Sequence, residues 1–256
     1  MLKAIIFDLD DTLIDWGDFF DEWEDIENPH LEKTHIYLEN LLDTPPSLAD
    51  LKKEYSKRTR NAWSHAHNTL IAPNLGRTLT ETLIALGVDE ALLELDALLK
   101  AYDWGKIPHT TVFPDVIPGL THLRDAGLRF GLVTNAFQPM ALRDVEMAEH
   151  GLLEFFPSCR FSAADHGYLK PHPSIFTKAL DCLGLEPEEV VFIGDNPIAD
   201  IAGAQAAGMR AVLRVTVSRK PLLSDTVIPD AAIKSLQELP DILDQWYPGW
   251  TNGAGT

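Results

Sequence analysis

The sequence predicts an α/β fold in which a doubly wound parallel sheet carries an inserted all-helical segment. Short, continuous apolar runs alternate with longer stretches of helical spacing, a pattern typical of parallel strands that are covered on both faces. A glycine follows each of the helical stretches that lie between these runs. A long internal region, residues 16–105, shows helical spacing and contains no comparable apolar run.

Four predicted strands define the sheet. They are residues 4–7, 130–133, 190–193 and 211–215. The predicted helices between them cover residues 116–126, 139–150, 173–183 and 198–207. Glycines follow each of these helices, at positions 127, 151, 184 and 208, and glycine adopts the left-handed conformation that ends a helix at low steric cost. Strand and helix therefore alternate as in βαβ units, and a last helix is expected at residues 236–246.

The internal region interrupts this alternation. Leucines recur there at helical spacing, for example Leu79, Leu83 and Leu86, which predicts helices packed on one another. Two adjacent prolines, Pro45 and Pro46, separate the first two of these helices. We therefore divide the chain into an α/β core domain, residues 1–15 and 106–256, and a helical domain, residues 16–105.

Composition restricts the partners of this chain. The sequence has 39 acidic and 21 basic residues, a net charge of −18 over 256 residues. Such acidity disfavours a nucleic-acid polymer or a membrane as partner, because both attract positive charge. A small anionic molecule stays compatible if a local cation or a metal ion receives it. We expect a monomer or homodimer.

The cysteines bear on the cellular compartment. Cys159 and Cys182 are the only two, too few for a disulfide framework and not at metal-ligand spacing. We expect both to be reduced residues of the core. Together with an N-terminus that lacks the pattern of a signal peptide, this predicts a cytoplasmic protein.

Polar side chains follow the predicted strands, where ligands of open α/β sheets bind. Asp8 and Asp10 follow the first strand and, two residues apart on an extended chain, point the same way. Thr134 and Asn135 follow the second strand, and Lys170 precedes Pro171 in a loop.

Two further carboxylates, Asp195 and Asp200, follow the strand at residues 190–193. Four carboxylates at one edge repel one another unless a positive charge lies among them. Because this group contains oxygen ligands and neither histidine nor cysteine, it favours Mg²⁺ over zinc.

The order of these motifs is specific. An Asp-x-Asp-x-Thr sequence at Asp8, then Thr134, then Lys170, then Gly-Asp-x-x-x-x-Asp ending at Asp200 resembles the haloacid dehalogenase superfamily, in its phosphatase-like branch. The resemblance covers about residues 1–15 and 106–215, and the helical segment resembles that family's helical cap.

The resemblance implies roles for these residues. Asp8 would be the nucleophile that forms an aspartyl-phosphate, and Asp10 the acid and base for the leaving alkoxide and the attacking water. Thr134, Lys170 and the backbone amide of Asn135 would bind the phosphoryl oxygens.

The same resemblance implies a Mg²⁺ cofactor. Asp8, the backbone carbonyl of Asp10 and Asp195 would be its direct ligands. Asp200 is assigned to this metal site as the residue that holds a metal-bound water or Lys170.

These roles predict hydrolysis of a small phosphorylated metabolite, such as a sugar, organic-acid or nucleotide phosphate. A sugar-phosphate mutase shares the core and the acid/base residue and stays open. A dehalogenase fits less well because a halide leaves without a proton and Asp10 would have no task. The complete motif set also disfavours a protein that only binds its ligand.

Other residues have weaker signals. We expect Asp11 to be a solvated turn acid and the Thr12 hydroxyl to tie the turn together. A cluster in the helical segment comprises Arg58, Arg60, Trp63, His65 and His67. We interpret it as a solvated helix face with one buried tryptophan, and contact with an anionic or planar group is the alternative. Trp16, Phe19 and Phe20 either line the pocket entrance or pack the hinge.

Overall fold

The computed structural model describes residues 1–17, 23–216 and 224–253. Its centre is a six-stranded sheet in the order β5-β4-β1-β6-β7-β8, with every neighbouring pair parallel. The strands are β1 (Ala4–Phe7), β4 (Arg129–Thr134), β5 (Arg160–Ser162), β6 (Val190–Gly194), β7 (Arg210–Arg214) and β8 (Ala231–Ile233). After β1, the chain adds β4 and β5 on one side of β1 and then crosses to add β6, β7 and β8 on the other side. This order confirms the predicted doubly wound sheet.

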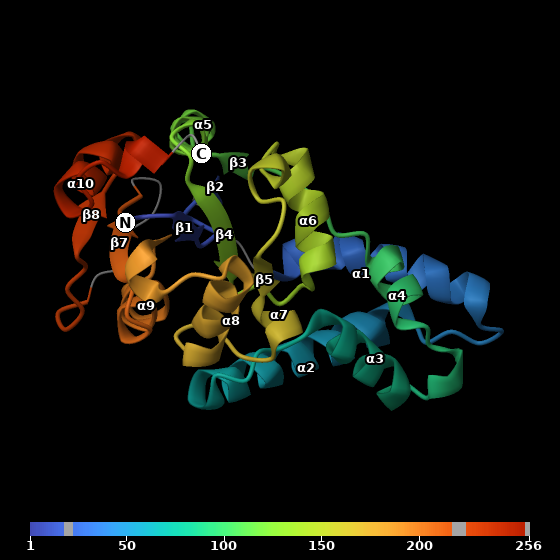
Figure 1. The fold of residues 1–256 in the computed structure, drawn as a ribbon. Coiled ribbons are helices and arrows are strands. Elements are labelled where there is room, and N and C mark those ends of the chain that lie inside the picture. Colours follow the sequence, from blue (N-terminus) through green and yellow to red (C-terminus); the bar gives the residue numbers. More distant parts are fainter. Residues whose placement is uncertain (18–22, 217–223, 254–256) are drawn as a thin grey trace.

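Helices cover both faces of the sheet (Figure 1). They are α5 (Val116–Asp125), α6 (Met140–Glu149), α7 (Ala163–His166), α8 (Pro173–Leu183), α9 (Gly203–Ala206) and α10 (Leu239–Trp246). Strand residues alternate between two hydrophobic clusters. Ile5 and Phe7 pack with residues of α5 and α10, whereas Ala4 and Ile6 pack with residues of α8 and α9. The continuous apolar runs of the sequence therefore reflect burial on both faces.

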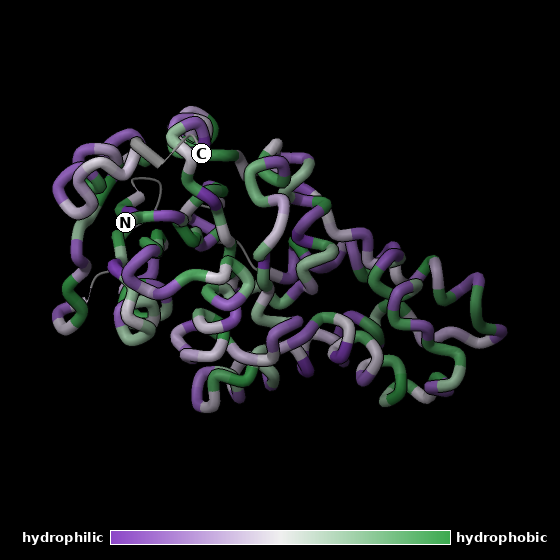
Figure 2. The backbone as a smooth tube through the Cα atoms, viewed as in Figure 1, coloured by the Kyte–Doolittle hydropathy of each residue, from purple (hydrophilic) through white to green (hydrophobic). Residues whose placement is uncertain are grey.

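The internal region is helical, as predicted. It contains α1 (Trp23–Leu41), α2 (Leu48–Thr69), α3 (Leu75–Ala85) and α4 (Leu95–Tyr102), and these helices project to one side of the sheet (Figure 1). Hydrophilic and hydrophobic residues alternate along them (Figure 2). They enclose a small core of Leu38, Leu51, Leu83, Val88 and Leu98.

A short antiparallel pair of strands, which no pattern in the sequence predicted, lies where the helical region joins the sheet. It consists of β2 (Ile14–Asp15) and β3 (Thr111–Val112). The edge strands β5 and β8 were missed as well, because runs of three residues carry too little apolar signal. The segment expected as one helix at residues 198–207 begins as a π-helix (Pro197–Ala202) and continues as α9. Short 3₁₀ turns lie at Glu90–Leu92, Leu153–Phe155, Pro187–Glu189, Leu236–Glu238 and Trp250–Gly253.

The expectation for the cysteines was wrong. Cys159 and Cys182 form a disulfide with a Cα–Cα distance of 5.6 Å. Cys159 precedes β5 and Cys182 lies on α8, so the pairing depends on how α8 packs on the sheet, which the spacing of the two cysteines does not reveal. The cysteine pattern therefore does not support the reduced compartment inferred from it. Among the described residues, no helix is long and apolar enough to cross a membrane.

Candidate active site

The carboxyl ends of β1, β4 and β6 bring the predicted polar residues together. β1 lies between the other two strands, with Phe7 in register with Leu132 on one side and Ile193 on the other. Asp8 and Asp195 directly follow β1 and β6, and Thr134 is the last residue of β4. We call the group at this edge the carboxylate edge; its members are Asp8, Asp10, Thr134, Lys170, Asp195 and Asp200.

Asp8 is buried, with 5% of its surface exposed. Lys170 Nζ lies 2.5 Å from Asp8 Oδ1, and Thr12 Oγ1 donates a hydrogen bond of 3.1 Å to Asp8 Oδ2. Burial raises the pKa of Asp8 to about 7, although Lys170 acts in the opposite direction. Thr12, expected to tie the turn together, thus bonds to the carboxylate of Asp8 itself.

Lys170 is the central cation of the carboxylate edge. Its ammonium contacts Asp8 Oδ1, Asp200 Oδ1 at 2.7 Å and the carbonyl oxygen of Val133 at 2.9 Å. Asn135 fixes the Lys170 backbone from both sides, since Lys170 N donates to Asn135 Oδ1 and Asn135 Nδ2 donates to Lys170 O. The side chain of Asn135 therefore positions Lys170.

Three carboxylates converge beside this lysine. Asp8, Asp195 and Asp200 each offer an oxygen, and these oxygens lie within 4.8 Å of one another. Burial, with the nearby charges of Asp200 and Asp8, raises the pKa of Asp195 to about 9. Asp200 Oδ2 accepts from Asn196 N at 2.9 Å. A Cβ at Gly194 would overlap the Asp200 carboxylate, so glycine is required for this close approach.

The donor set fits a hard divalent cation. Three carboxylates surround one ammonium, which leaves two negative charges without a counter-charge inside the cluster. All the converging side chains offer oxygen, the ligand that Mg²⁺ prefers. Burial is the largest cause of the raised pKa values of Asp8 and Asp195, and the negative charges of neighbouring carboxylates raise them further.

Asp10 lies in a different set of contacts. Its Oδ1 accepts from Trp16 Nε1 at 2.9 Å and pairs with Arg143 Nη2 at 2.5 Å, while Thr134 Oγ1 donates to its Oδ2 at 3.2 Å. The Asp10 side chain keeps 32% of its surface exposed. The two aspartates at the end of β1 are therefore held by different cations.

Sequence reasoning missed Arg143 and its partners. Arg143 lies on α6 with 1% of its surface exposed, and its Nη1 is 3.1 Å from Glu146 Oε2. Trp104 Nε1 donates to the same oxygen at 2.7 Å. Burial raises the pKa of Glu146 to about 7. The sequence did contain a signal for this pair. Arg143 has helical spacing with Met140 and Met147, which places it on the apolar face of the helix, and a charge buried there needs a partner.

The interpretation of Asp11 was wrong. Asp11 is 6% exposed, and its Oδ1 accepts from Trp16 N at 3.4 Å. The chain turns at Asp11 with a φ of 58°, and both Asp11 and Trp16 are buried. The turn therefore lies inside the protein and not in solvent.

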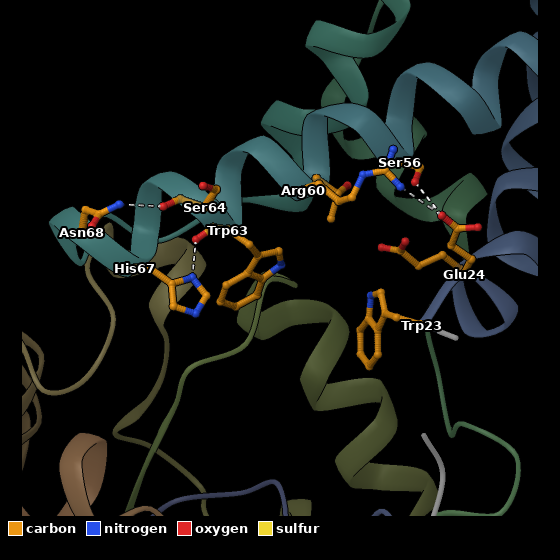
Figure 3. A pocket seen from close by; sticks show the side chains of 10 residues that line it. Trp23, Glu24, Ser56, Arg60, Trp63, Ser64, His67 and Asn68 are labelled. Carbon is orange, nitrogen blue, oxygen red and sulfur yellow. Dashed lines mark hydrogen bonds and ion pairs between the residues drawn. The ribbon is translucent and has the colours of Figure 1, made fainter. Parts of the chain in front are cut away.

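The residues of the cluster predicted in the helical segment do not all face the same space in the structure. Arg60, Trp63 and His67 line a cavity on one side of α2 (Figure 3). Arg58 pairs with Glu54 and Glu81, and His65 is exposed outside this lining. The expectation of one buried tryptophan on a solvated face is therefore inaccurate, since Trp63 is half-buried beside a cavity. Phe19 and Phe20 lie outside the described residues.

Comparison with known proteins agrees with the resemblance that the motifs indicate. A family model described as haloacid dehalogenase-like hydrolase matches residues 2–208. The chain is 30% identical to a glyceraldehyde 3-phosphate phosphatase of Methanopyrus kandleri over 248 residues, which cover 95% of this chain and 97% of that one. It is 29% identical to a phosphoglycolate phosphatase of Chromobacterium violaceum over 245 residues, 94% of this chain and 96% of that one.

Solved structures of similar fold include both phosphatases and dehalogenases. A HAD phosphatase from Thermococcus onnurineus superposes with a TM-score of 0.60 and 26% identity, covering 94% of this chain and 98% of that one. A 2-haloacid dehalogenase from Pseudomonas syringae superposes with the same TM-score and 27% identity, covering 96% of this chain and 100% of the other.

Proposed function

Because this chain belongs to the haloacid dehalogenase-like hydrolases, we propose that it is a Mg²⁺-dependent phosphatase that hydrolyses a small phosphomonoester through an aspartyl-phosphate on Asp8. The observation that carries the proposal is the pair of carboxylates at the end of β1. Asp8 is buried against Lys170, and the more exposed Asp10 is held by Arg143. Two carboxylates in such different surroundings suit two different chemical roles.

In the first step, an oxygen of Asp8 attacks phosphorus, and the bond from phosphorus to the leaving oxygen breaks. The proton that the leaving alkoxide needs comes from Asp10. Lys170 offsets negative charge on Asp8 and on the phosphoryl group. Thr134 Oγ1 and the backbone amide of Asn135 bind the phosphoryl oxygens, and Thr12 orients Asp8 through its hydrogen bond.

In the second step, water attacks the phosphorus of the aspartyl-phosphate. Asp10 takes a proton from this water, the bond from phosphorus to Asp8 breaks, and inorganic phosphate leaves. Both carboxylates then return to their initial state, so one residue serves as acid and afterwards as base.

The acidic cluster supports a metal ion in this reaction. Asp8, the backbone carbonyl of Asp10 and Asp195 would hold Mg²⁺, and Asp200 would keep Lys170 in place through their ion pair. Bound Mg²⁺ supplies positive charge that neutralises the carboxylates and the phosphoryl oxygens.

The presence of Asp10 favours phosphoryl transfer over dehalogenation. A halide leaves without a proton, whereas an alkoxide needs one. Asp10 is held at the site by two donors, Trp16 and Arg143, that do not bind the phosphoryl group. The relatives that carry phosphatase names over most of this chain support the same reaction class.

The test is release of inorganic phosphate from a panel of phosphomonoesters, with Mg²⁺ and with the metal removed by a chelator. Wild type is compared with Asp8→Asn, and the control is Asp181→Asn, an exposed acid on α8. We expect release that requires both Mg²⁺ and Asp8 and is unchanged in the control. Release that survives chelation or persists in Asp8→Asn would contradict the proposal, and isomerised product without free phosphate would favour a mutase.

A further inference from the structure

A large cavity lies between α1 and α2, outside the carboxylate edge. Its volume is about 1000 Å³. Figure 3 shows that the indole rings of Trp23 and Trp63 lie on the same side of α2, and we call this space the indole cavity. Its lining consists of Trp23, Glu24, Glu27, Ser56, Thr59, Arg60, Trp63, Ser64, His67 and Asn68.

Aromatic contacts connect the indole cavity with the carboxylate edge along two routes. The ring of Trp23 lies 5.9 Å from that of Trp16, and Trp16 Nε1 is hydrogen-bonded to Asp10. The ring of Trp63 lies 6.5 Å from that of Phe137, three residues beyond Thr134. The cavity therefore adjoins the side of the carboxylate edge on which Asp10, the proposed proton donor to the leaving group, lies.

The walls of the indole cavity suit a flat ligand. Trp23 keeps 45% of its surface exposed, whereas its neighbour Trp16 is 6% exposed. Two accessible indole faces offer a planar ring the stacking contacts that an aliphatic chain cannot make equally well.

The charges of the cavity disfavour a second anionic group. Arg60 is the only lysine or arginine among the described lining residues, and its Nη1 lies 3.4 Å from Glu24 Oε1. Glu27 is 4% exposed and accepts from Tyr55 at 3.0 Å. A carboxylate or second phosphate in this cavity would meet two acids and one arginine that is already paired.

The rim of the cavity offers hydrogen-bonding groups. Ser64, His67 and Asn68 follow one another along the last turns of α2 and are exposed (Figure 3). Ser56 and Arg60 bring further polar atoms at the other end of the lining. The indole cavity therefore combines apolar faces with a polar margin, the arrangement that binds a ring with polar substituents on its edge.

We propose that the substrate is a phosphomonoester whose leaving group carries a planar, uncharged ring with hydrogen-bonding substituents, such as the base of a nucleoside 5′-monophosphate. This inference rests on the proposed function. The ring lies against Trp23 and Trp63 while the phosphoryl group occupies the carboxylate edge. A triose or a two-carbon acid would leave most of the cavity empty.

The first experiment compares esters that differ in the ring. We expect kcat/KM for inosine and uridine 5′-monophosphates to exceed that for ribose 5-phosphate by about tenfold or more, the contribution of one stacked base. A second pair, benzyl phosphate and cyclohexylmethyl phosphate, differs in planarity while both carry an alkoxide leaving group. The planar ester is expected to react faster.

The variants locate the effect in the cavity. Trp63→Leu and Trp23→Leu are expected to lower kcat/KM for the nucleotides about tenfold more than for ribose 5-phosphate. Trp246→Leu, on α10, is the matched control because its ring packs against Arg210 elsewhere in the protein; it should leave the ratio unchanged. Circular dichroism and the midpoint of unfolding verify that each variant is folded.

The outcomes separate this inference from the proposed function. Equal kcat/KM values for nucleotides and ribose 5-phosphate, with hydrolysis that requires Asp8, would overturn the inference and leave the phosphatase standing. If no ester is hydrolysed, the proposed function fails, and binding of inosine 5′-monophosphate to Asp8→Asn decides the ligand class. The inference is supported if inosine 5′-monophosphate quenches tryptophan fluorescence more strongly than ribose 5-phosphate does, and if Trp63→Leu weakens this quenching. Equal quenching by the two ligands, or none, overturns the inference.

Discussion

The carboxylate edge and the indole cavity differ in how their side chains are held. At the carboxylate edge, Asp8, Lys170 and Asp200 are at most 5% exposed, and each contacts a charged partner. In the indole cavity, Trp23 is 45% exposed, and Arg60 forms an exposed ion pair with Glu24 at 3.4 Å. Buried charges that depend on one another tolerate little change, whereas an open aromatic wall can be altered locally. Changes at the edge should therefore affect all substrates, and changes in the cavity should affect their ranking.

The largest effect is expected from Lys170→Met. Without the ammonium, three carboxylates face one another and the phosphoryl group loses a cation, so activity should fall about 10³-fold. The fall should be the same for esters with and without a ring, because the change lies at the carboxylate edge. Lys178→Met, an exposed lysine on α8, is the control. Steady-state kinetics on both ester classes measures the effect, and a fall of less than about tenfold would argue against the role of Lys170.

The next effect concerns stability and not chemistry. Removing the disulfide with Cys159→Ser and Cys182→Ser together should lower the free energy of unfolding by about 3 kcal/mol, since the bond closes a loop with a sequence separation of 23. Cys159 precedes β5 at the amino ends of the strands, opposite the carboxylate edge, so kcat/KM should change less than about twofold.

Urea unfolding of wild type with and without reductant provides the control for this prediction. Reduced wild type should match the double variant, while the oxidised protein should be more stable. A large loss of activity with unchanged stability would show that the two ends of the sheet are coupled.

A smaller effect is expected from Arg143→Met. Arg143 holds the Asp10 carboxylate, so kcat for alkyl phosphates should fall about 10²-fold, the share of general acid catalysis. p-Nitrophenyl phosphate should lose less, because its leaving group needs little protonation. This difference identifies a positioning role, since a loss of folding would affect both substrates equally.

Arg143→Lys should restore part of the activity, and Arg124→Met on α5 is the surface control. An equal loss with both leaving groups would contradict the assignment of Arg143 to Asp10.

The smallest effect lies in the helical region. Burial raises the pKa of Glu27 from 4.5 to about 7, so the folded protein binds more protons than the unfolded chain between these values. Stability should therefore fall as pH rises through this window. Glu27→Gln cannot ionise, and its stability relative to wild type should rise by about 2 kcal/mol from about pH 5.5 to pH 7.5.

Urea unfolding at both pH values measures the effect of Glu27→Gln. Glu90→Gln, at an exposed acid, should show no such pH-dependent difference. If the difference in free energy of unfolding between Glu27→Gln and wild type does not change with pH, then Glu27 ionises in the folded protein much as it does in the unfolded chain.

Several site residues were predictable because their position follows from strand ends. Asp8, Thr134 and Asp195 lie at or directly after the carboxyl ends of parallel strands, so identifying the apolar runs was enough to place them at one edge. Arg143 and Glu146 were not found, because a charged pair on a helix usually indicates a solvent-facing side. Asp11 was misjudged for a similar reason, since an acid in a turn is usually solvated.

The sequence by itself determined the alternation of strands and helices, the helical region between β2 and β3, and the order of the motifs that meet at the carboxylate edge, because hydrophobic periodicity and strand direction are local properties. Only the tertiary structure decided which groups are buried together. The pairing of Asp10 with Arg143, the disulfide between Cys159 and Cys182, and the cavity between Trp23 and Trp63 all join distant segments. Such contacts depend on how helices pack against the sheet and against one another, which no local pattern encodes.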